Sequence, residues 1–151
     1  LVYRLFEHAH RCGIAEGTAG VGYCKVLGAG CPVDAEGGIS LLLQARDKGA
    51  LWVNHALASV YFNGTAGVQK NLRKAIDFLT EDAAVSSASA YAIMAAITAL
   101  GNETTPPDLS TAEYYLDMAK AATPNAQQIY DAIILTKSWI CMPELVKAVQ
   151  K

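Results

Sequence analysis

The chain has 151 residues, of which 52% are hydrophobic and 17% charged, which is enough apolar material for one domain to fold around its own core. The formal net charge is -2 with no basic excess, so the composition argues against nucleic acid and anionic membranes as partners. No apolar run approaches the roughly 18 residues of a membrane-spanning helix, and the N-terminus lacks the pattern of a signal peptide.

Residues 1–13 have apolar side chains at helical spacing and end in Cys12-Gly13, so we expect the second helix of a truncated repeat. His8 and His10 lie two positions apart, and on a helix such residues point to different faces. The spacing therefore favours solvated or partly packed histidines over a pair of metal ligands.

Residues 17–49 are expected to form the next repeat. Its first helix, 17–27, has glycine at positions 17, 20 and 22, each of which costs about 1 kcal/mol against alanine, so such a helix survives by close packing. The glycines at 28 and 30 indicate a turn, because no strand precedes them and no phosphate-binding lysine motif follows. A second helix then spans 35–48, with Asp34 before it and Gly49 ending it.

Residues 52–85 predict a helical hairpin, the best-defined part of the pattern. The first helix, 52–62, ends at Asn63-Gly64, where a residue able to adopt positive φ is expected. Asn71 is the expected N-cap of the second helix.

Residues 88–122 predict a third repeat. Helix 88–100 is apolar nearly all round, so it is either buried on every side or presents an apolar face to a partner. A polar loop with Pro106-Pro107 follows, and Asp108 or Ser110 caps helix 111–122.

Residues 125–151 are expected to close the fold. Helix 126–139 is the first helix of a fourth repeat, and residues 143–151 form a short, more charged helix that caps the stack.

The same residue types recur at intervals of 37 positions, which is the sign of an internal repeat. A leucine returns at Leu5, Leu42, Leu79 and Leu116. A polar capping residue returns at Asp34, Asn71 and Asp108. We therefore predict one all-α domain over residues 1–151, a right-handed α-solenoid of stacked antiparallel helix pairs with about 37 residues per repeat.

The central hairpin resembles the SEL-one-like repeat (SLR) family, relatives of the tetratricopeptide repeat. The residues that match the family pattern are Leu57-Ala58, Tyr61, Gly64, Gly67-Val68, Asn71, Lys74-Ala75 and Phe78. The neighbouring repeats depart from it: Cys24 and Thr98 stand at the position of Tyr61, and Thr105-Pro106-Pro107 replaces the Gly-Val turn. The resemblance spans roughly residues 5–139.

The resemblance implies a bacterial protein-interaction module, an adaptor or regulator, that binds a protein or peptide on a concave surface lined by the first helix of each repeat. By phase, the candidate partner-binding residues are Lys25, Asn54, His55, Ser59, Phe62, Tyr91, Ala92, Gln128 and Ile133. Each is also an ordinary surface or core residue of a helix. Trp52 and Trp139 either anchor a partner or pack between repeats.

Three other roles stay open at this point. One is a purely structural part of a larger scaffold, which the truncated first repeat favours. Some relatives are periplasmic immunity proteins that block a secreted toxin, and a small acidic solenoid suits that role. A cysteine-rich branch includes hydrolases or binders of cell-wall molecules, but its regular cysteine pairs are absent from this sequence. These relatives favour a periplasmic or secreted location over the cytoplasm.

Catalytic candidates are few. His55 and Ser59 lie four positions apart, on one face of a helix, which suits a base and a nucleophile. No third group is evident, so we expect a protein that is not an enzyme.

Four cysteines, Cys12, Cys24, Cys31 and Cys141, allow three pairings. Cys24 and Cys31 either form a disulfide, because one ends a helix and the other lies in the turn that folds back beside it, or are small buried thiols. No CxxC motif occurs and the histidines are not grouped with the cysteines, so we expect neither a metal nor another cofactor.

Overall fold

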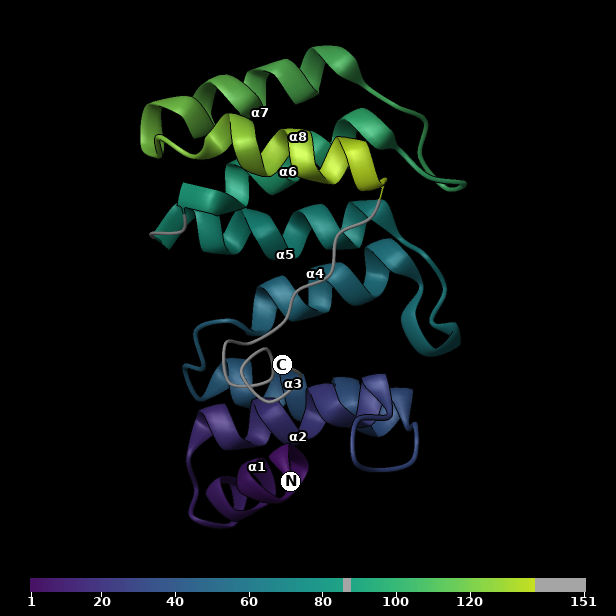
Figure 1. The fold of residues 1–151 in the computed structure, drawn as a ribbon, viewed down its shortest axis with the longest axis vertical. Helices are drawn as coiled ribbons and strands as arrows, with labels where there is room; N and C mark the ends of the chain where they lie inside the picture. The colour runs from purple at the N-terminus through teal and green to yellow at the C-terminus, as the bar shows by residue number, and fades with distance from the viewer. Residues whose placement is uncertain (86–87, 138–151) are drawn as a thin grey trace. The chain divides into compact units, whose positions relative to one another are not determined.

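A computed structural model describes residues 1–85 and 88–137 of the chain (Figure 1). The described residues form α-helices joined by short turns, which confirms the predicted all-α fold. The helices are α1 (Val2–Arg11), α2 (Ala15–Leu27), α3 (Ala35–Asp47), α4 (Val53–Asn63), α5 (Leu72–Val85), α6 (Ala88–Leu100), α7 (Leu109–Ala122) and α8 (Ala126–Thr136).

One side-chain hydrogen bond recurs at the start of each second helix, with the predicted period. Asp34, Asn71 and Asp108 each use a side-chain oxygen to accept a hydrogen bond from the backbone N–H three residues later, at 3.0, 3.0 and 3.1 Å. The first turn of a helix has N–H groups without intrahelical partners, and such a cap satisfies one of them. The capping residues predicted for α3, α5 and α7 are therefore confirmed, with Asp108 rather than Ser110 capping α7.

A backbone hydrogen bond recurs beside each cap. The N–H of the capping residue donates to a carbonyl near the end of the preceding first helix, that of Lys25, Tyr61 or Thr98, at 2.8, 2.9 and 3.1 Å. This bond ties the end of one helix to the start of the next. Each hairpin is therefore closed by the same pair of bonds.

The described residues divide into two compact units. Unit 1 contains residues 1–57 and 65–68, and unit 2 contains residues 58–64, 69–85 and 88–137. The division falls within α4.

Close helix packing in unit 1 explains the glycines of α2. A Cβ atom on Gly17 would lie 2.5 Å from the Cβ of Ala9, and one on Gly20 would overlap the ring of Phe6, both on α1. On the opposite side, a Cβ on Gly22 would lie 2.7 Å from the carbonyl oxygen of Gly38 on α3. The expectation that this helix depends on close packing is confirmed: any larger side chain would separate it from its neighbours.

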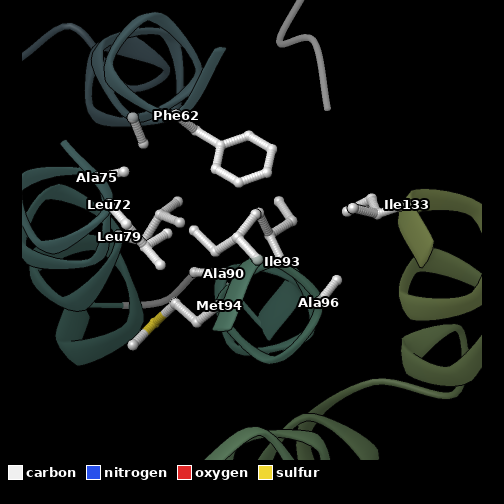
Figure 2. Close-up of a cluster of buried hydrophobic side chains, with 11 residues drawn as sticks. Phe62, Leu72, Ala75, Leu79, Ala90, Ile93, Met94, Ala96 and Ile133 are labelled. Atoms are coloured by element: carbon white, nitrogen blue, oxygen red, sulfur yellow. The ribbon is translucent and has the colours of Figure 1, made fainter. Parts of the chain in front are cut away.

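The core of unit 2 is built by α5 and α6, with contributions from the end of α4 and from α8 (Figure 2). Phe62, Leu72 and Leu79 meet Ile93 and Met94 in this cluster. Its buried members are Ala58, Phe62, Leu72, Ala75, Leu79, Ala90, Ile93, Met94, Ala96, Ile97 and Ile133. Burial of apolar surface at about 25 cal/mol per Å² makes this cluster a principal stabilising element of the unit.

Most of helix α6 is buried, whereas Tyr91 and residues 98–100 are partly exposed. It packs against α5, α7 and α8, and residues 90 and 92–97 are all buried. Of the two alternatives for this apolar helix, burial therefore holds for its apolar residues 92–97. Its small alanines allow the close approach of three neighbours.

The four leucines in phase have different environments. Leu42 and Leu79 are fully buried, Leu116 is partly buried, and Leu5 is 49% exposed. The turn after α4 contains a 3-10 turn, Thr65–Gly67, with Ala66 at a φ of 57°.

Several predictions lie outside the described residues: the closing helix 143–151, the end of the predicted helix 126–139 with Trp139, and Cys141. The prediction of one domain over residues 1–151 and the predicted bounds of its repeats stay predictions.

Candidate interaction surface

Four of the predicted partner-binding residues are accessible. Lys25 on α2 and His55 on α4 are partly exposed and belong to unit 1. Tyr91 on α6 is partly exposed and Gln128 on α8 is exposed, and both belong to unit 2. Each of these side chains lies on the first helix of a predicted pair and is accessible to a partner.

The other five predicted residues are buried. Phe62 and Ile133 are 7% and 5% exposed and lie in the core of unit 2 (Figure 2), while Ala92 packs with Ala119 and Ala126. Asn54 and Ser59 are 9% and 2% exposed. Helical phase alone did not distinguish them from the accessible residues, because a first helix has neighbours on more than one side.

The family-pattern residues of the central hairpin contact one another. The rings of Tyr61 and Phe78 stack with centroids 5.9 Å apart, and the ammonium of Lys74 lies 4.8 Å from the centroid of the Tyr61 ring. A cation over an aromatic face is attracted by the ring's quadrupole. The pattern therefore marks contacts that hold the hairpin together. In unit 1, Trp52 likewise packs on Tyr23, with ring centroids 5.9 Å apart.

The histidines near the N-terminus have separate neighbours. His10 Nδ1 lies 2.7 Å from Thr18 Oγ1, while His8 Nε2 lies 3.9 Å from the sulfur of Cys12. Within residues 1–85 and 88–137, no three His, Cys, Asp or Glu side chains come together as metal ligands.

Cys24 and Cys31 are free thiols in one apolar cluster of unit 1, so the structure does not contain the disulfide that was one of two alternatives. Burial raises the pKa of Cys24 to about 11, with a smaller contribution from nearby Cys31. Burial also raises the pKa of Cys31. Because the thiolate is the nucleophilic form, these thiols are poorly reactive at neutral pH.

Unit 2 contains a cavity of about 610 Å³ that the sequence did not reveal. Its walls come from the start of α5, the end of α6, the α6–α7 loop and the first half of α7. The residues lining it are Leu72, Arg73, Ile76, Thr98, Thr105, Pro106, Asp108, Thr111 and Tyr115. The one available signal was the replacement of the Gly-Val turn by Thr105-Pro106-Pro107, which changes the loop that forms one wall.

Two ionisable groups in this cavity have shifted pKa values. Burial raises the pKa of Tyr115, and nearby Tyr114 adds to the effect. The pKa of Asp108 is lowered because Thr111 donates to it both from its hydroxyl, at 2.6 Å, and from its backbone N–H, at 3.1 Å. At neutral pH the cavity therefore contains a neutral phenol and a hydrogen-bonded carboxylate.

None of the helices in the described part of the chain is both long enough and apolar enough to cross a bilayer.

Comparison with known proteins identifies solved structures with a similar fold. No model of a known protein family matches the sequence, and no curated protein matches it. Among solved structures, a Sel1 repeat protein from Oxalobacter formigenes is similar with a TM-score of 0.65 and 20% identity, over 87% of this chain and 53% of that one. A protective antigen present in uropathogenic Escherichia coli strains, which displays an SLR fold, is similar with a TM-score of 0.64 and 17% identity, over 91% of this chain and 29% of that one.

The chain thus spans about half the length of the first of these proteins and less than a third of the second. At this level of identity the similarity concerns the fold. It confirms the predicted resemblance at that level: the chain has the helical-repeat fold of SLR proteins.

Proposed function

We propose that this chain, which has the fold of SLR proteins, is a protein-interaction module that recognises a partner through side chains of its first helices. The similarity of fold is the observation that supports the proposal. A repeat protein makes each hairpin from local contacts, and the exposed side chains between these contacts can vary without loss of the fold. Recognition is therefore the function that this architecture supports best.

The accessible residues define where the partner binds in each unit. In unit 2, Tyr91 packs against the alanine cluster and is partly exposed, and Gln128 is exposed on α8. Tyrosine anchored in this way contributes strongly to interfaces, because it brings a large apolar area and a polar hydroxyl at low conformational entropy. In unit 1, Lys25 and His55 are the corresponding accessible residues. An adaptor or regulatory role follows from partner binding.

The test is to capture partners from a lysate of the source organism and to compare variants. The chain is immobilised and the retained proteins are quantified by mass spectrometry for the native sequence, Tyr91→Ala and Gln128→Ala. Glu113→Ala is the matched control, since Glu113 is exposed on α7, a second helix. Circular dichroism verifies that all variants stay helical.

We expect one or a few proteins to be lost with Tyr91→Ala and Gln128→Ala and retained with Glu113→Ala. Retention of the same proteins by every variant would contradict the proposal. Turnover of an envelope substrate that His55→Ala abolishes would support the hydrolase alternative in its place.

A further inference from the structure

The cavity of unit 2 combines apolar walls with several polar groups that have no partner among residues 1–85 and 88–137. Leu72, Ile76 and Pro106 supply apolar surface. Arg73 is exposed and forms no ion pair or hydrogen bond with the described residues. A binding site typically has this composition: mostly apolar walls and a few well-placed polar groups, in a volume of about 300–1,000 Å³.

Besides the cation of Arg73, the cavity contains hydroxyl groups that can bind a ligand. Tyr115 is partly buried, and its hydroxyl makes no hydrogen bond to the described residues. The hydroxyls of Thr98 and Thr105 likewise have no hydrogen-bond partner in this part of the chain. A tyrosine hydroxyl is protonated at neutral pH, and burial raises the pKa of Tyr115 further, so this hydroxyl is available as a donor.

The acidic groups nearby are already engaged or lie outside the cavity. Asp108 accepts two hydrogen bonds from Thr111 as the cap of α7 and makes no ion pair with Arg73. Glu103 in the α6–α7 loop pairs with Lys70 at 3.2 Å. Asp77 is close enough to contribute to the raised pKa of Tyr115, but it does not line the cavity. Asp108 is an ionised group of the same cavity, but its carboxylate is engaged by Thr111, so the guanidinium of Arg73 is the charged group of the lining that has no partner among the described residues.

The loop that forms one wall is held in a defined shape. Asn102 Oδ1 accepts hydrogen bonds from Thr104 N, Thr104 Oγ1 and Thr105 N, at 2.9, 2.7 and 3.1 Å. Gly101 has a φ of 62°, and a Cβ there would lie 2.6 Å from the nitrogen of Pro107, so this bend requires glycine. A wall that is ordered before binding lowers the entropy lost when a ligand is bound.

We propose that this cavity binds an acidic segment of a protein partner, in which an Asp or Glu lies beside an apolar residue. The guanidinium of Arg73 binds the carboxylate, for which its planar donors are suited. The Tyr115 hydroxyl donates to the same carboxylate or to the segment's backbone, and the apolar side chain covers Leu72 and Ile76. The inference rests on the proposed interaction function. It adds a second binding surface and specifies the chemistry of the segment that binds there.

The experiment screens immobilised octapeptides of random sequence with the labelled full chain. The peptides that bind are then measured in solution by fluorescence anisotropy, together with forms in which Glu or Asp is replaced by Gln or Asn. The variants are Arg73→Glu, Arg73→Lys and Tyr115→Phe. Lys120→Glu is the matched control, because it makes the same charge change at an exposed position of α7 that does not line the cavity.

We expect the bound peptides to be enriched in an acid next to Leu, Ile or Phe. Arg73→Glu should weaken their binding by about tenfold or more, Tyr115→Phe by a few-fold, and Lys120→Glu by less than about twofold. Arg73→Lys should retain part of the affinity, because it keeps the charge and loses the paired donors. The amide forms of the peptides should bind as weakly to the native chain as the acidic forms bind to Arg73→Glu.

Three outcomes would overturn the inference: no enrichment of acidic peptides, equal binding to native and Arg73→Glu chains, or binding of free glutamate by calorimetry without binding of any peptide. The proposed function is tested separately by the loss of captured proteins in Tyr91→Ala. Loss of those proteins with no binding of acidic peptides would reject the cavity as a peptide site and leave the interaction module in place.

Discussion

Leucines at the same position of different repeats differ in burial, so replacing each by alanine tests whether burial determines the loss of folding stability. Leu79 on α5 and Leu5 on α1 are two repeat intervals apart, but Leu79 is fully buried whereas Leu5 is 49% exposed. Replacement by alanine removes three carbon atoms in each case, at about 0.8 kcal/mol per buried group. For Leu79 this amounts to about 2.4 kcal/mol, and the cavity left behind raises the expected loss to about 3–4 kcal/mol.

For Leu5→Ala, half of the side-chain surface is already in water and no closed cavity forms. We therefore expect a loss of about 1 kcal/mol or less. Helix propensity is matched between the two variants, because both replace leucine by alanine within a helix. Leu42→Ala, at the intervening repeat position on α3 and also fully buried, should behave like Leu79→Ala.

Urea unfolding followed by circular dichroism at 222 nm measures the difference. With a slope of about 2 kcal/mol/M, Leu79→Ala should lower the midpoint by about 1.5–2 M, and Leu5→Ala by about 0.5 M or less. Equal losses for Leu5→Ala and Leu79→Ala, or a loss below about 1 kcal/mol for Leu79→Ala, would refute the assignment of burial.

Gly38→Ala should destabilise the chain by about 1–3 kcal/mol, because the added Cβ would lie 2.5 Å from the carbonyl oxygen of Gly22. An unchanged melting temperature in thermal unfolding would contradict this close crossing of α2 and α3. The pKa of Asp108 is lowered by the hydroxyl of the threonine three residues later, so its stabilising effect is complete above the unfolded-state pKa and is lost as the pH falls through the lower folded-state pKa. Urea midpoints at pH 6 and pH 2.5 should therefore differ more for the native chain than for Asp108→Asn, and an equal difference would exclude this origin of acid sensitivity. Alkylation of the folded chain at pH 8 should label exposed Cys12 and spare Cys24, whose pKa is raised to about 11 by burial, until urea is added; mass spectrometry would reveal any equal labelling of both thiols.

Local interactions explain why much of the fold could be predicted. The caps at Asp34, Asn71 and Asp108 depend on residues only three positions away, and the turn at Gly64 depends on its own backbone angle. Helical periodicity is local in the same sense. These features placed most helix ends within one or two residues and identified the repeat.

Burial of the candidate site residues could not be predicted in the same way. The repeat pattern assigned Phe62, Ile133, Tyr91 and Gln128 alike to the binding faces of first helices. Phe62 and Ile133 instead lie in the core of unit 2. Whether a helix face meets solvent or a neighbour depends on residues dozens of positions away. The small side chains of α6, which admit three helices around it, decided this burial.

The sequence by itself determined that the chain forms capped helix pairs at intervals of about 37 residues. Capping hydrogen bonds and apolar spacing depend on residues only three or four positions apart. Only the tertiary structure decided which in-phase leucines are buried and that Arg73 shares a cavity with Tyr115, 42 positions further along the chain. The physical reason is that a cavity is the space left between packed elements, and its walls and unpaired groups are defined when α5, α6 and α7 come together.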